Sequence, residues 1–176
     1  MPNITIRTLT PSEATAALPA LADILSDCVE GGASVGFMSP YTQQDAIPYW
    51  QGVAKAVAEG NTVLITAETD GEILGTVQLG IGMMPNQPHR ADLKKLLVHR
   101  KARGLGLSRL LMDAAEAEAI KHRRHVLVLD TATGSPAETI YEKYGWQRVG
   151  VIPKYALMPD GSYCGSTFFY KSLASD

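Results

Sequence analysis

The chain has 176 residues, 45% of them hydrophobic and 19% charged, which suits one soluble domain with a core that needs neither metal nor disulfide support. A net charge of −2 and a pI near 6.1 leave no overall basic field, so nucleic acid is a poor candidate for the main partner. Two cysteines without ligand spacing and no long apolar or leader-like segment favour free thiols, no membrane contact and a cytoplasmic location.

The N-terminal third is predicted to hold one strand and a set of helices. Alternating isoleucines indicate a strand over 4–9, and the sequence over 10–13, TPSE, has the threonine, proline and glutamate of a helix start. A main helix is expected from Pro19 to the glycine pair at 31–32. A further helix over 43–59 contains an internal proline and ends at a glycine.

The segment 31–41, GGASVGFMSPY, has more apolar side chains than a solvated linker normally shows. These side chains could form a small satellite core under the domain, or they could line a substrate pocket. The candidate substrate-binding residues here and in the helix that follows are Ser34, Val35, Phe37, Met38 and Trp50.

Strands dominate the middle of the chain. Two alternating apolar runs within 62–82 flank Asp70-Gly71, the dipeptide favoured in type I′ turns, and predict a β-hairpin. Another strand is expected from about 91 to 98. The basic run at 121–125 resembles a nucleic-acid patch, but cations also stabilise the C-terminal end of a helix. We interpret the run as the basic last turn of a helix.

The stretch 94–116, KKLLVHRKARGLGLSRLLMDAAE, is predicted to run from a buried strand through a basic turn into a helix. Gly104 and Gly106 allow a tight turn and close approach of a ligand to the backbone. The free N–H groups at the start of the helix then form an anion site, for which pyrophosphate is a natural ligand. Taken alone, the same pattern also fits an ordinary surface turn with solvated cations.

The C-terminal part completes a βαβ unit and adds an antiparallel pair of strands. An apolar strand at 126–129 should lie parallel to the strand at 91–98, so both end at the edge where ligands bind in open α/β sheets. A helix from about 135 to 144 leads to a strand at 146–149, and Asp160-Gly161 turns the chain into a last strand at 167–170.

This order of elements resembles the GNAT superfamily of acetyl-CoA-dependent N-acetyltransferases. Residues 101–106, KARGLG, resemble the family's pyrophosphate motif, and residues 137–146, AETIYEKYGW, resemble its later helix motif. Two motifs at this separation, in the expected strand and helix context, are far more specific than either one. Lys101 stands where the family usually has Gln or Arg, and Gly134 where it often has an Asn that contacts pantetheine, with Ser135 the candidate substitute.

The resemblance implies a single α/β domain over 1–176. Its mixed, mostly antiparallel sheet would have about seven strands, a parallel and splayed central pair, and about four flanking helices. It also implies acetyl-CoA as co-substrate and no metal. The residues that it places at the coenzyme are Leu96, Leu97, Val98, Lys101, Arg103, Gly104, Leu105, Gly106, Leu107, Ser108 and Ser135.

Acetyl transfer to an amine needs a base, stabilisation of an oxyanion and a proton for the departing thiolate. The family resemblance assigns the oxyanion to main-chain N–H groups at Leu97 and Val98, and the acid to Tyr141. Likeness to the tabtoxin-resistance acetyltransferases, a group within the superfamily, implies Asp92 and Asp130 as candidate bases. From the residues alone, either carboxylate could instead be a solvated or capping group.

The sequence therefore predicts an enzyme that acetylates the primary amine of a small molecule, such as an amino-acid-like toxin or antibiotic. Acetylation of a protein N-terminus or lysine, and a non-catalytic acyl-CoA-binding module, are the alternatives. The protein is expected to be a monomer or a homodimer.

Overall fold

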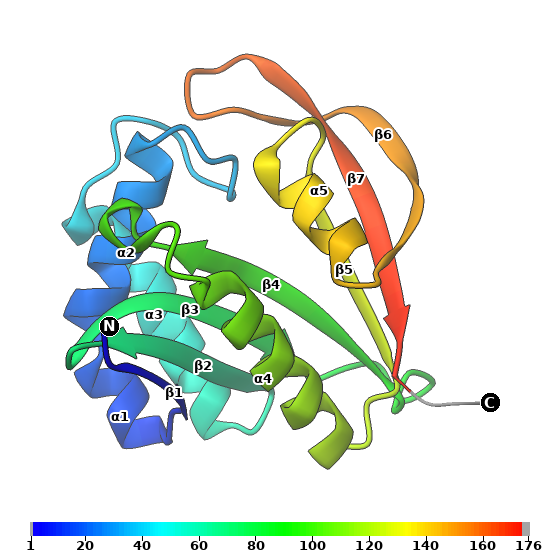
Figure 1. The fold of residues 1–176 in the computed structure, drawn as a ribbon, viewed down its shortest axis with the longest axis horizontal. Coiled ribbons are helices and arrows are strands. Elements are labelled where there is room, and N and C mark those ends of the chain that lie inside the picture. The colour runs from blue at the N-terminus through cyan, green and yellow to red at the C-terminus, as the bar shows by residue number, and fades with distance from the viewer. Residues whose placement is uncertain (1, 174–176) are drawn as a thin grey trace.

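A single seven-stranded sheet forms the centre of the molecule (Figure 1). The computed structural model describes residues 2–173. The strands are β1 (Ile4–Thr8), β2 (Thr62–Thr69), β3 (Glu72–Gly80), β4 (Arg90–Val98), β5 (Val126–Ala132), β6 (Gln147–Leu157) and β7 (Tyr163–Ser172). Their order is β1-β2-β3-β4-β5-β7-β6, and only β4 and β5 run parallel. The fold class expected from the sequence is confirmed.

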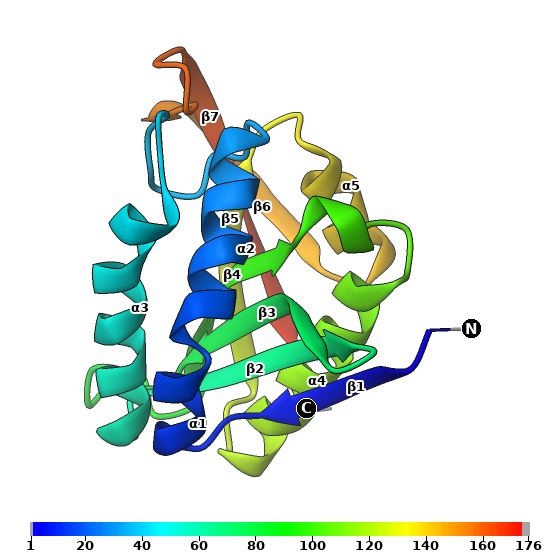
Figure 2. The same cartoon turned by 90° about the vertical axis from the view of Figure 1, so that its left-hand side faces the viewer.

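Helices cover both faces of the sheet. They are α1 (Pro11–Ala16), α2 (Leu18–Glu30), α3 (Gln43–Ala58), α4 (Leu107–Lys121) and α5 (Pro136–Lys143), and a 3-10 turn, η1 (Arg100–Ala102), precedes α4. Figure 2 shows α1, α2 and α3 on one face and α4 and α5 on the other. The break between α1 and α2 falls at Ala17, just before Pro19 in the first turn of α2, as expected from the predicted restart at Pro19, and the described residues form five α-helices where about four were expected.

Local sequence rules explain how several of these elements begin and turn. Thr10 and Glu13 form a capping box at the start of α1, which satisfies two free backbone N–H groups at once. At the β2–β3 turn both Asp70 and Gly71 have positive φ, 52° and 85°, as a type I′ turn requires. The predicted helix start and hairpin are therefore confirmed.

Two apolar cores lie on opposite faces of the sheet. The core beneath α4 and α5 includes Leu127, Leu129, Tyr141 and Phe169. The other core packs α1, α2 and α3 against the sheet, with Trp50 fully buried in it. Because side chains alternate along a strand, Val128 and Asp130 face the α2–α3 side of the sheet.

The parallel pair β4–β5 separates soon after it begins. Its ladder comprises three residue pairs and ends at Asp92↔Val128. Beyond that point β4 pairs only with β3, and β5 pairs only with β7 as far as Ala132. The two strands therefore diverge toward their C-terminal ends, as Figure 1 shows, and the facing edges lack ladder partners. The splayed pair expected from the family resemblance is confirmed.

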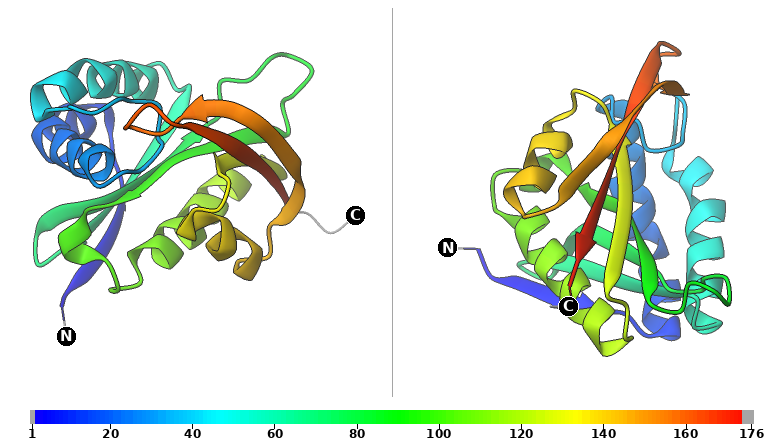
Figure 3. Two further views of the ribbon diagram at one scale, coloured as in Figure 1. Left: turned by 90° about the horizontal axis from the view of Figure 1, so that it is seen from above. Right: turned by 90° about the vertical axis from the view of Figure 1, so that its right-hand side faces the viewer.

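The last two strands are longer than the sequence pattern predicted. β6 and β7 continue well beyond 146–149 and 167–170 and form a hairpin that reaches past the rest of the sheet (Figure 3). β6 is an edge strand and is exposed along almost its whole length, so it lacks the apolar alternation by which strands are recognised. No helix within residues 2–173 is long and apolar enough to cross a membrane.

Candidate active site

The turn between β4 and α4 has the geometry of an anion site. Gly104 and Gly106 lie in the left-handed region, with φ of 82° and 78°, and no atom would crowd a Cβ added to either. Gly106 is the N-cap of α4, and no side chain caps the helix there. The N–H groups from Gly104 to Ser108 have no hydrogen-bond partner in the part of the chain that the structure describes. An anionic ligand can therefore bind these donors.

Of the basic side chains near this turn, Arg103 is available for a ligand. Arg100 is held by Asp27, with Nε to Oδ1 at 2.8 Å, and Lys101 forms an ion pair with Glu72 on β3. Arg103 is exposed and has no ion-pair partner among residues 2–173. Both Lys101 and Arg103 were predicted to contact the coenzyme, and of the two Lys101 is already engaged in an ion pair.

The unpaired edge of β4 presents main-chain groups to the gap between β4 and β5. His99 donates its N–H to Leu74 of β3 at 2.9 Å. Because successive peptide groups on a strand point to opposite sides, the Leu97 N–H faces β3 and the Val98 N–H faces the gap. Val98 is thus the better placed of the two predicted oxyanion donors.

Tyr141 of α5 lies in the core beneath α4 and α5, on the face of β5 that carries Leu129. Its ring is 6% exposed and packs against Trp146 and Phe169, with centroids 6.0 and 5.8 Å away. Its hydroxyl has no hydrogen-bond partner among the described residues, yet it is not among the fully enclosed polar atoms that lack one. Burial, aided by the charge of Asp130, raises the pKa of Tyr141 to about 12, so the hydroxyl keeps its proton at neutral pH.

Asp130 and Asp92 both lie on the sheet face opposite the α4–α5 core. Asp130 is exposed near the end of β5 and accepts a hydrogen bond of 2.6 Å from Ser166 on β7. Asp92 lies where β4 and β5 part, and its carboxylate is 3.6 Å from the guanidinium of Arg90. Val128 pairs with Asp92, and Asp130 lies two residues further along β5. The two aspartates are therefore offset by roughly 6.6 Å along the strand direction.

Ser135 begins α5 immediately beside the end of β5. Its hydroxyl is 3.4 Å from that of Thr131, and it caps no N–H of the helix. The preceding turn is fixed by Glu138, which accepts hydrogen bonds from the Gly134 N–H at 2.5 Å and the Thr167 hydroxyl at 2.7 Å. These bonds lower the pKa of Glu138. The Ser135 hydroxyl thus contacts Thr131 and not the backbone of α5.

The predicted substrate loop, 31–41, is attached to the β6–β7 hairpin. The Ser34 hydroxyl donates to the Leu157 carbonyl at 2.9 Å, and the Ser39 N–H donates to Pro159 at 3.1 Å. Val35 and Phe37 pack against the α1–α3 core, while Met38 is 43% exposed. Two hydrogen bonds thus hold the loop against the hairpin.

The prediction for Trp50 does not agree with its position. Its side chain is 0% exposed and belongs to the core, so it cannot contact a ligand. The neighbouring Tyr49 faces the sheet instead, where its hydroxyl accepts a 2.9 Å hydrogen bond from Gln78, and its ring lies 5.3 Å from that of Phe37. Tyr49 and Gln78 line a groove of about 410 Å³ together with Lys94.

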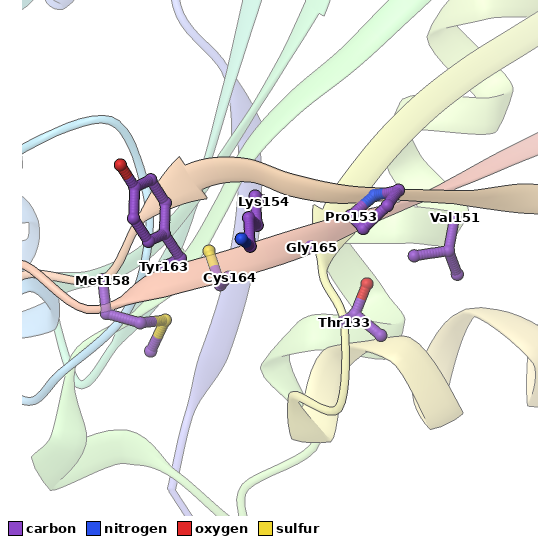
Figure 4. Close-up of a pocket in the computed structure, with 8 residues that line it drawn as sticks. All are labelled: Thr133, Val151, Pro153, Lys154, Met158, Tyr163, Cys164 and Gly165. Carbon is purple, nitrogen blue, oxygen red and sulfur yellow. The ribbon is translucent and has the colours of Figure 1, made fainter.

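A second groove, of about 640 Å³, lies on the β6–β7 hairpin beside the end of β5 (Figure 4). Figure 4 shows Thr133 on the α5 side and Met158, Tyr163 and Cys164 toward the tip of the hairpin. The Cys164 sulfur is 3.6 Å from the Ser34 hydroxyl, so the groove borders the 31–41 loop. It gives a solvent-side approach to the region that this loop covers.

Sequence reasoning missed Lys95. This lysine lies in a β-bulge of β4 with φ of 53°, and its ammonium lies over the rings of Phe37 and Tyr49 at 5.8 and 5.6 Å. Its position on the pocket side depends on the bulge, which the apolar pattern of the strand does not reveal. Lys94 and Lys95 are consecutive, and nothing in the sequence distinguishes them.

Solved structures share this fold over nearly the whole chain. The yncA protein of Salmonella typhimurium, solved with acetyl-CoA, covers 98% of this chain and 95% of its own at 18% identity and a TM-score of 0.79. A ribosomal-protein-alanine N-acetyltransferase of Brucella melitensis matches 96% and 99% of the two chains at 25% identity and a TM-score of 0.78. A candidate phosphinothricin N-acetyltransferase matches 98% and 100% at 19% identity and a TM-score of 0.79.

The family follows from the sequence profile. Residues 35–154, well over half of the chain, match the acetyltransferase (GNAT) domain. This range holds the splayed pair β4–β5, the glycine turn and the helix that carries Tyr141. The chain therefore belongs to the GNAT acetyltransferase family.

Proposed function

We propose that the protein transfers an acetyl group from acetyl-CoA to the primary amine of a small molecule. The observation that carries this proposal is that Asp130 and Tyr141 lie on opposite faces of the sheet, beside the part of β5 that is unpaired toward β4. Asp130 lies on the α2–α3 side and Tyr141 on the α5 side, and the charge of Asp130 acts on the Tyr141 hydroxyl. A candidate base and a candidate acid thus lie on opposite faces of the sheet beside this unpaired edge.

The residues present fit acetyl-CoA, which would supply the acetyl group as a thioester. The pyrophosphate would be held by the free N–H groups from Gly104 to Ser108 and by Arg103, since a helix start with open space above its glycines favours an anion. The pantetheine arm would lie between the diverging strands, within reach of Ser135. Because Lys101 is paired with Glu72, Arg103→Ala should weaken coenzyme binding more than Lys101→Ala does.

On the amine side, Asp130 would accept the proton that the amine loses, and Asp92 is the alternative base. The Val98 N–H would donate to the carbonyl oxygen as charge develops on it, a contribution of roughly 2.7–4 kcal/mol in enzymes where one such donor was removed. Tyr141 would give its proton to the departing thiolate. Because its pKa is raised, the hydroxyl carries that proton at neutral pH.

The attachment of the 31–41 loop to the β6–β7 hairpin supports a small substrate. The two hydrogen bonds from Ser34 and Ser39 attach the 31–41 loop to the β6–β7 hairpin, which narrows the space where a polypeptide would have to lie. Amino-acid-like toxins or antibiotics are our leading candidates, among them tabtoxinine-β-lactam and phosphinothricin. The second is the named substrate class of one structure with this fold.

Acetylation of a protein N-terminus is the second candidate. It is favoured by the likeness to a ribosomal-protein-alanine N-acetyltransferase at 25% identity. Opening of the 31–41 loop would be needed to admit a peptide there.

The test is an assay of CoA-thiol release from acetyl-CoA with a panel of small amines, including the two toxins above, and with peptides that begin with alanine. Release with amines and not with peptides supports the proposal, and the reverse result supports the second candidate. Calorimetry that shows acetyl-CoA binding while no acceptor gives release would identify a non-catalytic acyl-CoA-binding module.

A further inference from the structure

Lys95 is a partly buried lysine that the proposed reaction does not use. The β3–β4 ladder slips between Thr76 and Gln78, so that Lys95 and the next residue of β4 lie opposite a single residue of β3. This bulge, with φ of 53° at Lys95, turns the side chain onto the face beneath the 31–41 loop. A Cβ added to Gly36 in that loop would lie 3.7 Å from the Lys95 ammonium.

The surroundings of this ammonium are aromatic. It lies 5.8 Å from the centre of the Phe37 ring and 5.6 Å from that of Tyr49, distances at which a ring face attracts a cation. Tyr49 is itself fixed by the hydrogen bond from Gln78 at 2.9 Å. The rings therefore hold the ammonium in place without neutralising it.

No carboxylate neutralises Lys95 within residues 2–173, where its ammonium has neither an ion pair nor a hydrogen bond. Burial lowers the pKa of Lys95, the charge of Lys94 lowers it further, and only Asp130 opposes them. A partly buried cation without an anion is costly, and a ligand that brings an anionic group relieves that cost.

Asp130 and Lys95 together form a pair of opposite charges with a space between them. They are close enough for Asp130 to act on the pKa of Lys95, yet they form no ion pair. Both lie on the α2–α3 side of the sheet at the diverging ends of β4 and β5. A small zwitterion fits such a pair, because its amine can meet Asp130 while its carboxylate meets Lys95.

We propose that Lys95 binds the carboxylate of the substrate, so that the enzyme selects free amino acids and their analogues over amines that lack a carboxylate. This inference rests on the proposed function and deepens it, because it names the substrate class and assigns a specificity-determining residue. Phe37 and Tyr49 keep the ammonium directed at the substrate.

The test compares amino acids with the amines that remain when the carboxylate is removed: L-histidine with histamine, L-tyrosine with tyramine and L-lysine with cadaverine. Wild-type enzyme should show a higher kcat/KM for the carboxylated member of at least one pair. Lys95→Gln should lower that kcat/KM about 10- to 100-fold, mainly by raising KM, because a hydrogen bond to a charged group is lost. For the matching amine the change should stay below about 3-fold.

Lys121→Gln is the control, since it removes an exposed lysine at the end of α4, on the other face of the sheet, and should leave the preference unchanged. Lys95→Arg keeps the charge and should retain part of the preference. Melting temperatures of the variants establish that each is folded, and if Lys95→Gln does not fold, Lys95→Arg still reports the preference.

Three results would overturn the inference. One is acetylation of amines with no preference for the carboxylated member of any pair. Another is an equal fall of kcat for both members in Lys95→Gln, which would assign Lys95 to proton transfer. The third is no CoA release with any amine. That result would overturn the proposed function as well, whereas the first two leave acetyl transfer intact, so failure of the inference and failure of the proposed function are distinguishable.

Discussion

Replacement of Tyr141 by phenylalanine isolates one hydroxyl group at the β4–β5 gap. Phenylalanine retains the ring that packs 6.0 Å from Trp146 and 5.8 Å from Phe169, so the core is preserved. The hydroxyl has no hydrogen-bond partner among the described residues, so its removal breaks no internal bond. We expect a change in stability below about 1 kcal/mol, or a Tm shift of at most about 2–4 °C.

The effect on catalysis should be much larger. If Tyr141 protonates the departing thiolate, Tyr141→Phe should lower kcat by about 10²-fold or more at saturating acetyl-CoA. Because burial raises the pKa of this tyrosine to about 12, the wild-type hydroxyl is only about one thousandth ionised at pH 9. The wild-type kcat should therefore show no loss from Tyr141 ionisation up to that pH.

Tyr144→Phe serves as the control, because Tyr144 ends the same helix and its ring stacks on Arg109 at 4.7 Å, away from the proposed chemistry. CoA-thiol release at several pH values and thermal melts of both variants supply the measurements. A kcat for Tyr141→Phe within about 3-fold of the wild-type value, in a folded variant, would remove Tyr141 from the role of acid.

Three further predictions follow from glycine geometry and from shifted pKa values. Gly106→Ala places a side chain at a φ of 78°, which should lower the free energy of unfolding by about 1–2 kcal/mol and raise the Kd for acetyl-CoA measured by calorimetry. Gly60→Ala, at a φ of 73° in a distant turn, should lower stability by as much and leave that Kd unchanged. The pKa of Glu138 is lowered in the fold, so its stabilising effect is present above its ordinary pKa and is lost as the pH falls through the lowered value. The Tm deficit of Glu138→Gln at pH 7 should therefore shrink as the pH falls below 4.5, and a constant deficit would contradict this. Burial raises the pKa of Cys28 to about 11, so a thiol reagent at pH 8 should label the partly exposed Cys164 quickly and Cys28 only after unfolding. Equal labelling rates for the two cysteines would refute the protection of Cys28 by burial.

Short-range chemistry made much of the fold predictable. Asp70-Gly71 specifies its turn because both residues tolerate positive φ, and the capping box at Thr10 satisfies its own helix end. Gly104 and Gly106 have the predicted freedom for the same reason. Such features depend on neighbours within a few residues, so the sequence contains them completely.

Side-chain partners that are distant in sequence were not predictable. Lys101 is bound by Glu72, which lies on another strand, and nothing in the sequence indicates that pairing. Tyr49 and Trp50 are consecutive aromatic residues of α3, and only the packing of that helix buried the second and turned the first toward the pocket. The helical pattern by itself did not indicate which of the two aromatic side chains would be buried.

The sequence by itself determined the glycine turn, the helix that carries Tyr141 and the order of the elements, because each is encoded by local spacing. Tertiary structure alone decided where β4 and β5 part, since the end of their ladder at Asp92 depends on pairing with β3 and β7. It also decided the position of Lys95, because the bulge that directs this side chain exists only when β4 is paired with β3. The proposed coenzyme site thus depends on local sequence, whereas the charges that we propose to face the substrate are set by the pairing of distant strands.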